Sequence, residues 1–200
     1  MDDDQLTPEG EAELVARLEA TVAELRARWP KRPPPEQLTT ELIAATADDA
    51  LDDLVLEFVD RKRPADFTGE DYSWLNHLPI GVRLMWCSIA VEGELNNGGF
   101  NQFFFNGTDA LAPGAIAGFE AIGAEPFAVL IKEAVVRAGE NASEVARGWG
   151  QGSMDDFMGS YKEGIFKDLD DRLYALYDQV DPASLRVAWM RAHAAELNAG

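Results

Sequence analysis

The sequence predicts an all-α fold, and three observations carry that prediction. Apolar residues recur at three- and four-residue spacing in most segments, which is the period of an amphipathic helix. No segment shows sustained two-residue alternation, and no β-branched run is bounded by hairpin turns. Proline stands where helices begin, as in Thr7-Pro8-Glu9 and Asp181-Pro182. With 200 residues and 46% hydrophobic content, the chain suits one compact helical domain with an N-terminal helical arm.

The first element expected is the N-terminal arm. Apolar residues share one helical face from Thr7 to about Trp29, and they are Leu14, Val15, Leu18, Val22 and Leu25. The segment PKRPPP at 30–35 follows and is typical of a stiff basic linker. We therefore divide the chain into a helix and linker at 1–35 and an all-helical domain at 36–200.

The domain after the linker is expected to consist of helices joined by loops. Its predicted elements are helices at 36–46 and 48–62, a helical turn at 72–78, helices at 80–95, 113–122 and 126–138, a Gly-rich connection at 139–153, and helices at 154–161, 167–179 and 182–197. The segment 80–95 is apolar nearly all round, which indicates a central, buried helix.

The most unusual stretch is IAVEGELNNGGFNQFFFNG at 89–107, which combines five side-chain amides with paired glycines and three consecutive phenylalanines. Glycine allows backbone conformations that other residues avoid, and Asn beside Gly tends to bond the local backbone. We therefore expect a helix that ends near Leu95, a tight turn, and a short aromatic helix from about Gly99 to Asn106. One of the two nearby glutamates should accept hydrogen bonds from the backbone of the turn, while the other faces water. This motif is interpreted mainly as an internal joint, made of Glu92, Glu94, Asn96, Asn97, Gly98, Gly99, Phe100, Gln102 and Asn106.

The run EGELNNGGFNQFFFN resembles the signature of a bacterial family of unknown function whose characterised members include a DNA-mimic protein. The residues that fit are Gly93, Glu94, Asn96 to Phe100, Gln102 and Asn106, and the segments 169–174 and 185–193 also resemble the closing helices of that family. The resemblance covers roughly 74–197. It implies a non-enzymatic, all-helical DNA mimic that occupies the DNA-binding surface of a basic protein such as a helix-turn-helix regulator.

The charge of the chain points to the same class of partner. Asp and Glu number 36 against 17 Lys and Arg, which gives a formal charge of −19. Such a field repels nucleic acid and anionic membranes and attracts basic protein surfaces. We therefore expect a basic DNA-binding protein as partner, and neither direct nucleic-acid binding nor membrane association. Acidity that serves solubility alone is the alternative.

The predicted partner-binding surface starts from the helix at 48–62. Its residues Asp49, Asp53 and Glu57 repeat at i, i+4, where like charges repel by about a few tenths of a kcal/mol per pair. The full predicted set is Asp48, Asp49, Asp52, Asp53, Glu57 and Asp60, with Asp168, Asp170, Asp171 and Asp178 facing outward as a second row. An ordinary solvated acidic face is the alternative interpretation.

The sequence offers little material for catalysis. His77 and His193 are the two histidines, and the single Cys87 lies in an apolar segment without a flanking cation. There is no Gly-rich phosphate loop, dinucleotide fingerprint or calcium-loop spacing. We expect no enzyme activity, cofactor or metal. The lone cysteine and the acidic start of the chain favour a cytoplasmic location.

Two other functions stay open from the sequence. One is an antagonist, immunity-type or scaffold protein that binds its partner by shape near the amide-rich turn. The other is a small hydrolase or ligand-binding protein that uses Glu92 and Glu94 for acid–base work. Residues two apart on a helix point in different directions, which argues against that pair. The sequence also leaves open the identity of the partner and whether two copies form a homodimer.

Overall fold

The computed structural model describes residues 16–17, 20–21, 35–69, 71–142 and 164–198. The chain divides into two compact units, at 1–33 and 34–200. In the first unit, residues 16–17 and 20–21 are helical. The remainder of the predicted N-terminal helix, nearly all of the linker at 30–35, most of the connection at 139–153 and the whole predicted helix at 154–161 lie outside the described residues.

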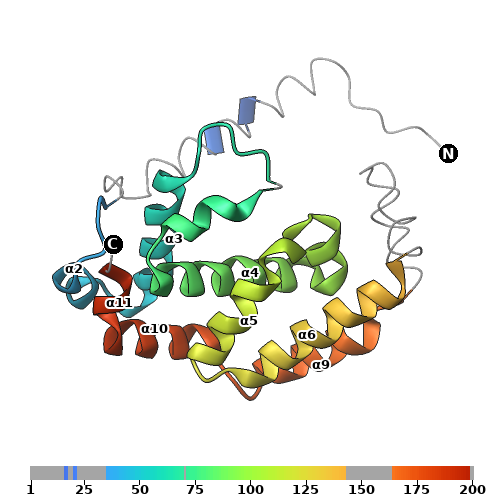
Figure 1. The fold of residues 1–200 in the computed structure, drawn as a ribbon. Helices are drawn as coiled ribbons and strands as arrows, with labels where there is room; N and C mark the ends of the chain where they lie inside the picture. Colours follow the sequence, from blue (N-terminus) through green and yellow to red (C-terminus); the bar gives the residue numbers. More distant parts are fainter. Residues whose placement is uncertain (1–15, 18–19, 22–34, 70, 143–163, 199–200) are drawn as a thin grey trace. The chain divides into compact units, whose positions relative to one another are not determined.

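All secondary-structure elements in the described part of the second unit are helices, and it contains no strand (Figure 1), so the prediction of an all-α fold is confirmed. In chain order its elements are α2 (Thr40–Ala45), η1 (Asp48–Ala50), α3 (Leu51–Lys62), η2 (Tyr72–His77), α4 (Ile80–Phe105), η3 (Thr108–Leu111), α5 (Ala112–Ala121), α6 (Glu125–Glu140), α9 (Lys167–Tyr177), α10 (Pro182–Ala192) and α11 (Ala194–Asn198), where η marks a 3₁₀ helix. None of these described helices has the length and apolarity needed to cross a membrane.

Helix α4 is the element around which the others pack, as its apolar sequence predicts. It contacts α3, α5, α9 and α11, and it runs through the middle of the unit in Figure 1. Its residues Val82, Met85, Val91 and Leu95 are fully buried. Such complete burial requires apolar side chains on more than one face, which explains why the segment shows no narrow amphipathic stripe.

Two glycines allow α5 to lie close against α4. A Cβ at Gly114 would stand 2.6 Å from the Sγ atom of Cys87, and one at Gly118 would collide with the carbonyl oxygen of Leu84. Any other residue at either position would therefore push the two helices apart. The close approach fixes how the core helices stack.

The amide-rich stretch forms a joint within α4. Helical backbone continues through Asn97, and non-helical dihedrals occur at Gly98 (φ −163°, ψ 25°) and Gly99 (φ 64°, ψ −159°). The joint and the aromatic helix after it were predicted, but the first helix does not end near Leu95. It runs two residues further, because the change of direction takes place at the two glycines while the buried Leu95 is still held in the helical core.

Several other helix ends differ from the predicted ones. The first helix of the unit begins at Thr40 rather than at 36, because Thr39 caps it by accepting a hydrogen bond from the Leu42 N–H (3.2 Å). The helix predicted at 48–62 starts as the 3₁₀ turn η1 before α3. Asp181 caps α10 as predicted, but the last helix is broken at His193 into α10 and α11.

Candidate interaction surface

Helix α3 separates an apolar face from an acidic one. Its buried side chains are Leu51, Leu54, Val55, Phe58 and Val59. On the other side, Asp49 just before α3 and Asp53 within it are exposed, and Glu57 is half-buried. No described Lys or Arg forms an ion pair with any of these three carboxylates. We call Asp49, Asp53 and Glu57 the acidic row.

The other three acids predicted for this face are ion-paired. Asp48 binds Arg191 at 2.5 Å, and Asp60 binds Arg63. Asp52 is half-buried and accepts hydrogen bonds from the Nε and Nη2 atoms of Arg186 at 3.0 and 2.6 Å. The six carboxylates therefore do not form a uniformly unpaired face.

In the predicted second row, two of the four acids also form ion pairs. Arg137 donates to Asp168 (Nη2 to Oδ2, 3.0 Å), and the side-chain hydrogen bond lowers the pKa of that carboxyl. Lys167 pairs with Asp171 at 2.7 Å. Asp178, directly after α9, is exposed and has no described cationic partner.

The prediction that Asp170 faces outward is wrong. Its Oδ1 atom accepts a hydrogen bond from the backbone N–H of Phe100 at 2.9 Å, and burial raises the pKa of its carboxyl. The joint at Gly98 and Gly99 interrupts the helix, so Phe100 begins a new helical segment and its N–H needs an acceptor. Asp170 supplies that acceptor from α9, as an N-cap residue would.

A buried ion cluster joins three helices. Arg186 of α10 is 3% exposed and binds both Asp52 of α3 and Glu92 of α4. Burial raises the pKa of the Glu92 carboxyl, and this effect exceeds the opposing attraction of Arg186. Burial lowers the pKa of Arg186, but the carboxylates of Asp52 and Glu92 more than compensate, so the guanidinium stays charged. The cluster therefore fixes α3 relative to α4 and α10.

Glu94 forms hydrogen bonds with partners other than those of Glu92. Its Oε2 atom accepts hydrogen bonds from the side-chain amides of Gln102 (3.0 Å) and Asn106 (2.7 Å), across the joint in α4. The expectation that one glutamate accepts from the backbone of the turn and the other faces water is therefore wrong. Because the turn takes its backbone acceptor from Asp170, Glu92 is left to pair with Arg186 and Glu94 with the amides.

The two arginines of α10 were not predicted from the sequence as part of the site. Arg186 lies four residues from both Pro182 and Met190, which are buried, so it stands within an apolar stripe. A cation at such a position signals a buried partner, and this signal is visible in the sequence. Arg191 donates to the backbone oxygens of Ile43 and Thr46 as well as to Asp48, and it thereby ties α10 to the end of α2.

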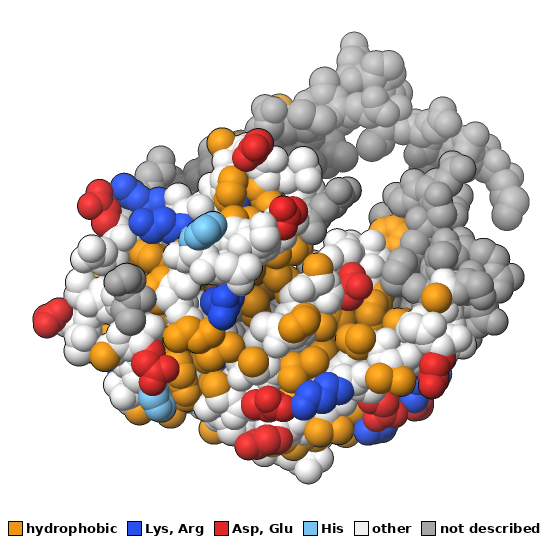
Figure 2. Space-filling view, in the orientation of Figure 1, with side chains coloured by type: hydrophobic (Ala, Val, Ile, Leu, Met, Phe, Trp, Pro, Cys, Tyr) orange, Lys and Arg blue, Asp and Glu red, His pale blue; other side chains and the backbone are white. Residues whose placement is uncertain are grey.

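The surface drawn in Figure 2 carries no continuous acidic patch. Its Asp and Glu side chains lie apart, with Lys and Arg between several of them, around a broad band of hydrophobic side chains. Among the described residues, no group of three or more His, Cys, Asp and Glu side chains is arranged to hold a metal ion. The acidic row is thus the unpaired, regularly spaced set that remains from the predicted surface.

Comparison with known families gives one match. A family model described as DMP19-like protein matches residues 76–193, which is more than half of the chain. The match includes the joint in α4, Glu92 and Arg186, and it leaves out α2, η1 and α3 with the acidic row. Neither a curated protein nor a solved structure matches the chain. The chain belongs to the family of DMP19-like proteins.

Proposed function

We propose that this protein is a non-enzymatic DNA mimic that occupies the DNA-binding surface of a basic protein, such as a helix-turn-helix transcriptional regulator of the cytoplasm. The observation that carries the proposal is the acidic row, three carboxylates at i, i+4 spacing without a described cationic partner. Membership of the DMP19-like family and the formal charge of −19 support it. The acidic row lies outside the residues that the family model matches, so it would be a feature of this chain.

The mechanism is electrostatic competition. Carboxylates of the acidic row would pair with the Arg and Lys side chains that otherwise contact phosphates, and the negative field would steer the encounter. Along α3 an i, i+4 step rises about 6 Å. Phosphates of one DNA strand follow each other at about 3.4 Å along the axis. The row would therefore satisfy roughly every second phosphate contact of a basic surface.

The ion pairs beside the acidic row decide which further acids can take part. Asp48 and Asp60 are exposed, and exposed ion pairs contribute only about 0–1 kcal/mol, so a partner could exchange its cations for Arg191 and Arg63. Asp52 is held by the buried Arg186 and serves to position α3. Rigid placement of the row lowers the ordering cost of binding.

The second row remains a weaker part of the proposal. Asp168 and Asp171 are exposed but already bound by Arg137 and Lys167, and Asp178 has no ion-pair partner among the described residues. Asp170 is engaged at the joint and is not proposed as a contact. We therefore rank Asp168, Asp171 and Asp178 below the acidic row as partner contacts.

The two alternatives receive less support. Of the aromatic residues after the joint, Phe100, Phe103 and Phe104 are buried and only Phe105 is partly exposed, so a partner that recognises shape near the turn would find little aromatic surface there. Glu92 and Glu94 have different hydrogen-bond partners, so they do not face each other as an acid–base pair would.

Competition with duplex DNA tests the proposal. The full chain is immobilised, exposed to a lysate of its source organism, and washed; duplex DNA is then applied. A mimic releases a DNA-binding protein under these conditions, because the two ligands exclude each other on one surface. Retention of every captured protein in the presence of excess DNA would contradict the proposal, and so would capture of proteins without a DNA-binding surface.

A further inference from the structure

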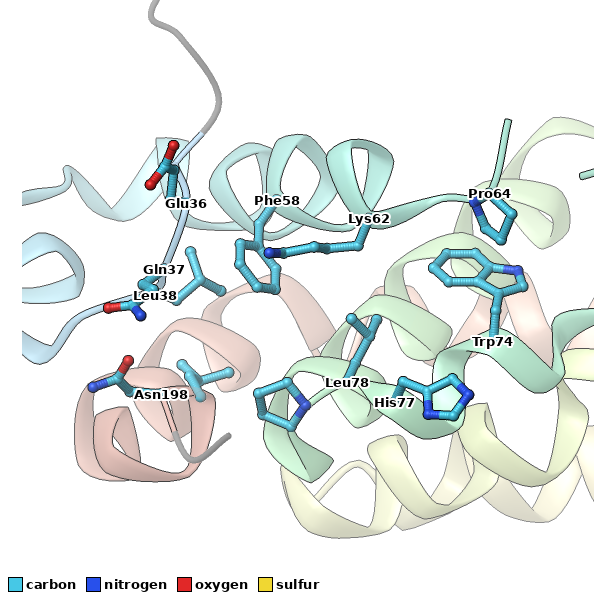
Figure 3. A pocket seen from close by; sticks show the side chains of 12 residues that line it. Glu36, Gln37, Leu38, Phe58, Lys62, Pro64, Trp74, His77, Leu78 and Asn198 are labelled. Carbon is cyan, nitrogen blue, oxygen red and sulfur yellow. The ribbon is translucent and has the colours of Figure 1, made fainter. Parts of the chain in front are cut away.

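A pocket of about 450 Å³ lies beside α3 (Figure 3), and no residue of the acidic row lines it. Its walls come from the segment before α2, from α3 and the segment that follows it, from η2 and the turn into α4, and from α11. The lining residues are Glu36, Gln37, Leu38, Phe58, Lys62, Pro64, Trp74, His77, Leu78, Pro79, Leu197 and Asn198. This volume lies within the range of about 300–1,000 Å³ that is typical of small-molecule sites.

The interior of the pocket suits a flat apolar group. Its walls include the aromatic side chains of Phe58 and Trp74 and the aliphatic side chains of Leu38, Leu78 and Leu197. Figure 3 shows Leu78 between the two aromatic side chains. A ring that enters such a site gains by burying apolar surface on both partners.

One cation at the pocket is available to a ligand. Lys62 is exposed, its Nζ atom lies 5.4 Å from the centre of the Phe58 ring, and no described carboxylate forms an ion pair with it. In Figure 3 its side chain runs back along α3 toward that ring.

The other charged or titratable residues at the pocket do not neutralise the charge of Lys62. Glu36 is paired with Arg61 at 3.2 Å, so its charge is already compensated, and His77 adds an exposed imidazole. Among the residues that line the pocket, Lys62 is therefore the charged side chain without a described ion-pair partner.

We propose that this pocket binds a small aromatic carboxylate, with its ring against Phe58, Trp74 and Leu78 and its carboxylate at Lys62. The apolar walls select the ring, and the unpaired ammonium selects the anion over a neutral group of the same shape. This site is separate from the acidic row, and it holds whether or not the protein mimics DNA.

The test compares an acid with its neutral analogue. The full chain, ¹³C-labelled at leucine methyl groups, is titrated by NMR with 3-phenylpropionate and with 3-phenylpropanamide. We expect the methyl signals of Leu38, Leu78 and Leu197 to shift, while those of Leu173 in the core stay in place. The acid should bind about fivefold more tightly than the amide, the size expected for one exposed ion pair.

Two variants assign that preference to Lys62. Lys62→Met keeps the aliphatic stem and should bring the acid and the amide to equal affinity. Lys132→Met removes an exposed ammonium elsewhere and should leave the preference unchanged. Equal binding of the two probes by the unmodified chain, absence of shifts at the three leucines, or an acid preference that survives Lys62→Met would each overturn the proposal.

Discussion

The Arg186 guanidinium of α10 holds the carboxylate of Asp52 on α3, 134 positions away in the sequence, with Nη2 and Oδ2 2.6 Å apart. The same guanidinium binds Glu92 of α4. Three helices of the unit therefore meet at one buried cation. Removing one partner of such a cluster leaves buried charge without compensation.

We predict that Arg186→Met lowers the free energy of unfolding by about 3–5 kcal/mol, because both Asp52 and Glu92 lose their cation in a buried setting. Urea denaturation followed by circular dichroism measures the loss. The matched control is Arg172→Met, which removes the exposed ion pair with Glu133 and should change stability by about 1 kcal/mol or less. Similar losses in the two variants would show that the buried cluster contributes no more to stability than an exposed ion pair.

The Glu92 carboxyl gives a prediction about pH. Burial raises its pKa above the ordinary value of 4.5, so the folded protein keeps this proton at pH values where the unfolded chain has lost it. The contribution of Glu92 to stability is therefore largest below pH 4.5 and falls as the pH rises through the folded pKa. Urea denaturation at a series of pH values gives the free energy of unfolding of the unmodified chain and of Glu92→Gln, and the two are compared at each pH. If the unmodified chain became more stable relative to Glu92→Gln as the pH rises, the raised pKa would be contradicted.

Gly99 at the joint and Gly93 in regular helix both belong to α4, and alanine should have opposite effects on stability at the two positions. Gly99 has φ 64° and ψ −159°, and a Cβ there would stand 2.7 Å from the Cγ atom of Asp170. We predict that Gly99→Ala destabilises the protein by about 1–3 kcal/mol. Gly93 lies in regular helix with open space around it, so Gly93→Ala should stabilise by about 0.5–1 kcal/mol. Thermal unfolding of both variants checks the opposite signs, and equal shifts in the melting temperature would count against this account of the joint.

Cys87 is predicted to be unreactive in the folded protein. It is 2% exposed, and burial raises the pKa of its thiol to about 12. Because the thiolate is the nucleophile, alkylation by iodoacetamide at pH 8 should be slow in buffer and rapid in urea. Mass spectrometry of timed samples measures both rates. Rapid labelling without urea would show that the contact between α4 and α5 opens readily.

The sequence predicted those features that depend on local pattern. The period of apolar residues located α3, α4, α9 and α10, and Asp181 followed by proline marked the start of the last helices. The glycine pair located the joint in α4 because glycine alone tolerates the backbone found at Gly99. Burial of Cys87 followed from its apolar neighbours.

The partners of the charged residues could not be predicted in the same way. Asp52 and Asp53 are neighbours on one acidic helix, yet Asp52 binds Arg186 while Asp53 is exposed. The difference depends on where α10 crosses α3, which no local pattern specifies. Asp170 was placed outward because Leu169 and Leu173 point inward, but it lies on the flank of α9 that meets the joint. Tertiary packing therefore decided which acids remain unpaired.

The most direct test of the central claim is the affinity of this protein for a DNA-binding protein that it captures, measured with the acidic row reversed in charge. The triple variant Asp49→Lys, Asp53→Lys, Glu57→Lys is compared with Glu125→Lys, Glu140→Lys, Glu196→Lys, which makes the same change in charge at exposed acids of α6 and α11 that belong to neither proposed row. Affinities are measured at about 50 mM and about 200 mM salt. We predict that reversal of the acidic row abolishes binding and its steep dependence on salt, while the control variant keeps most of both. Equal losses in the two variants, or binding that survives reversal of the acidic row, would contradict the claim.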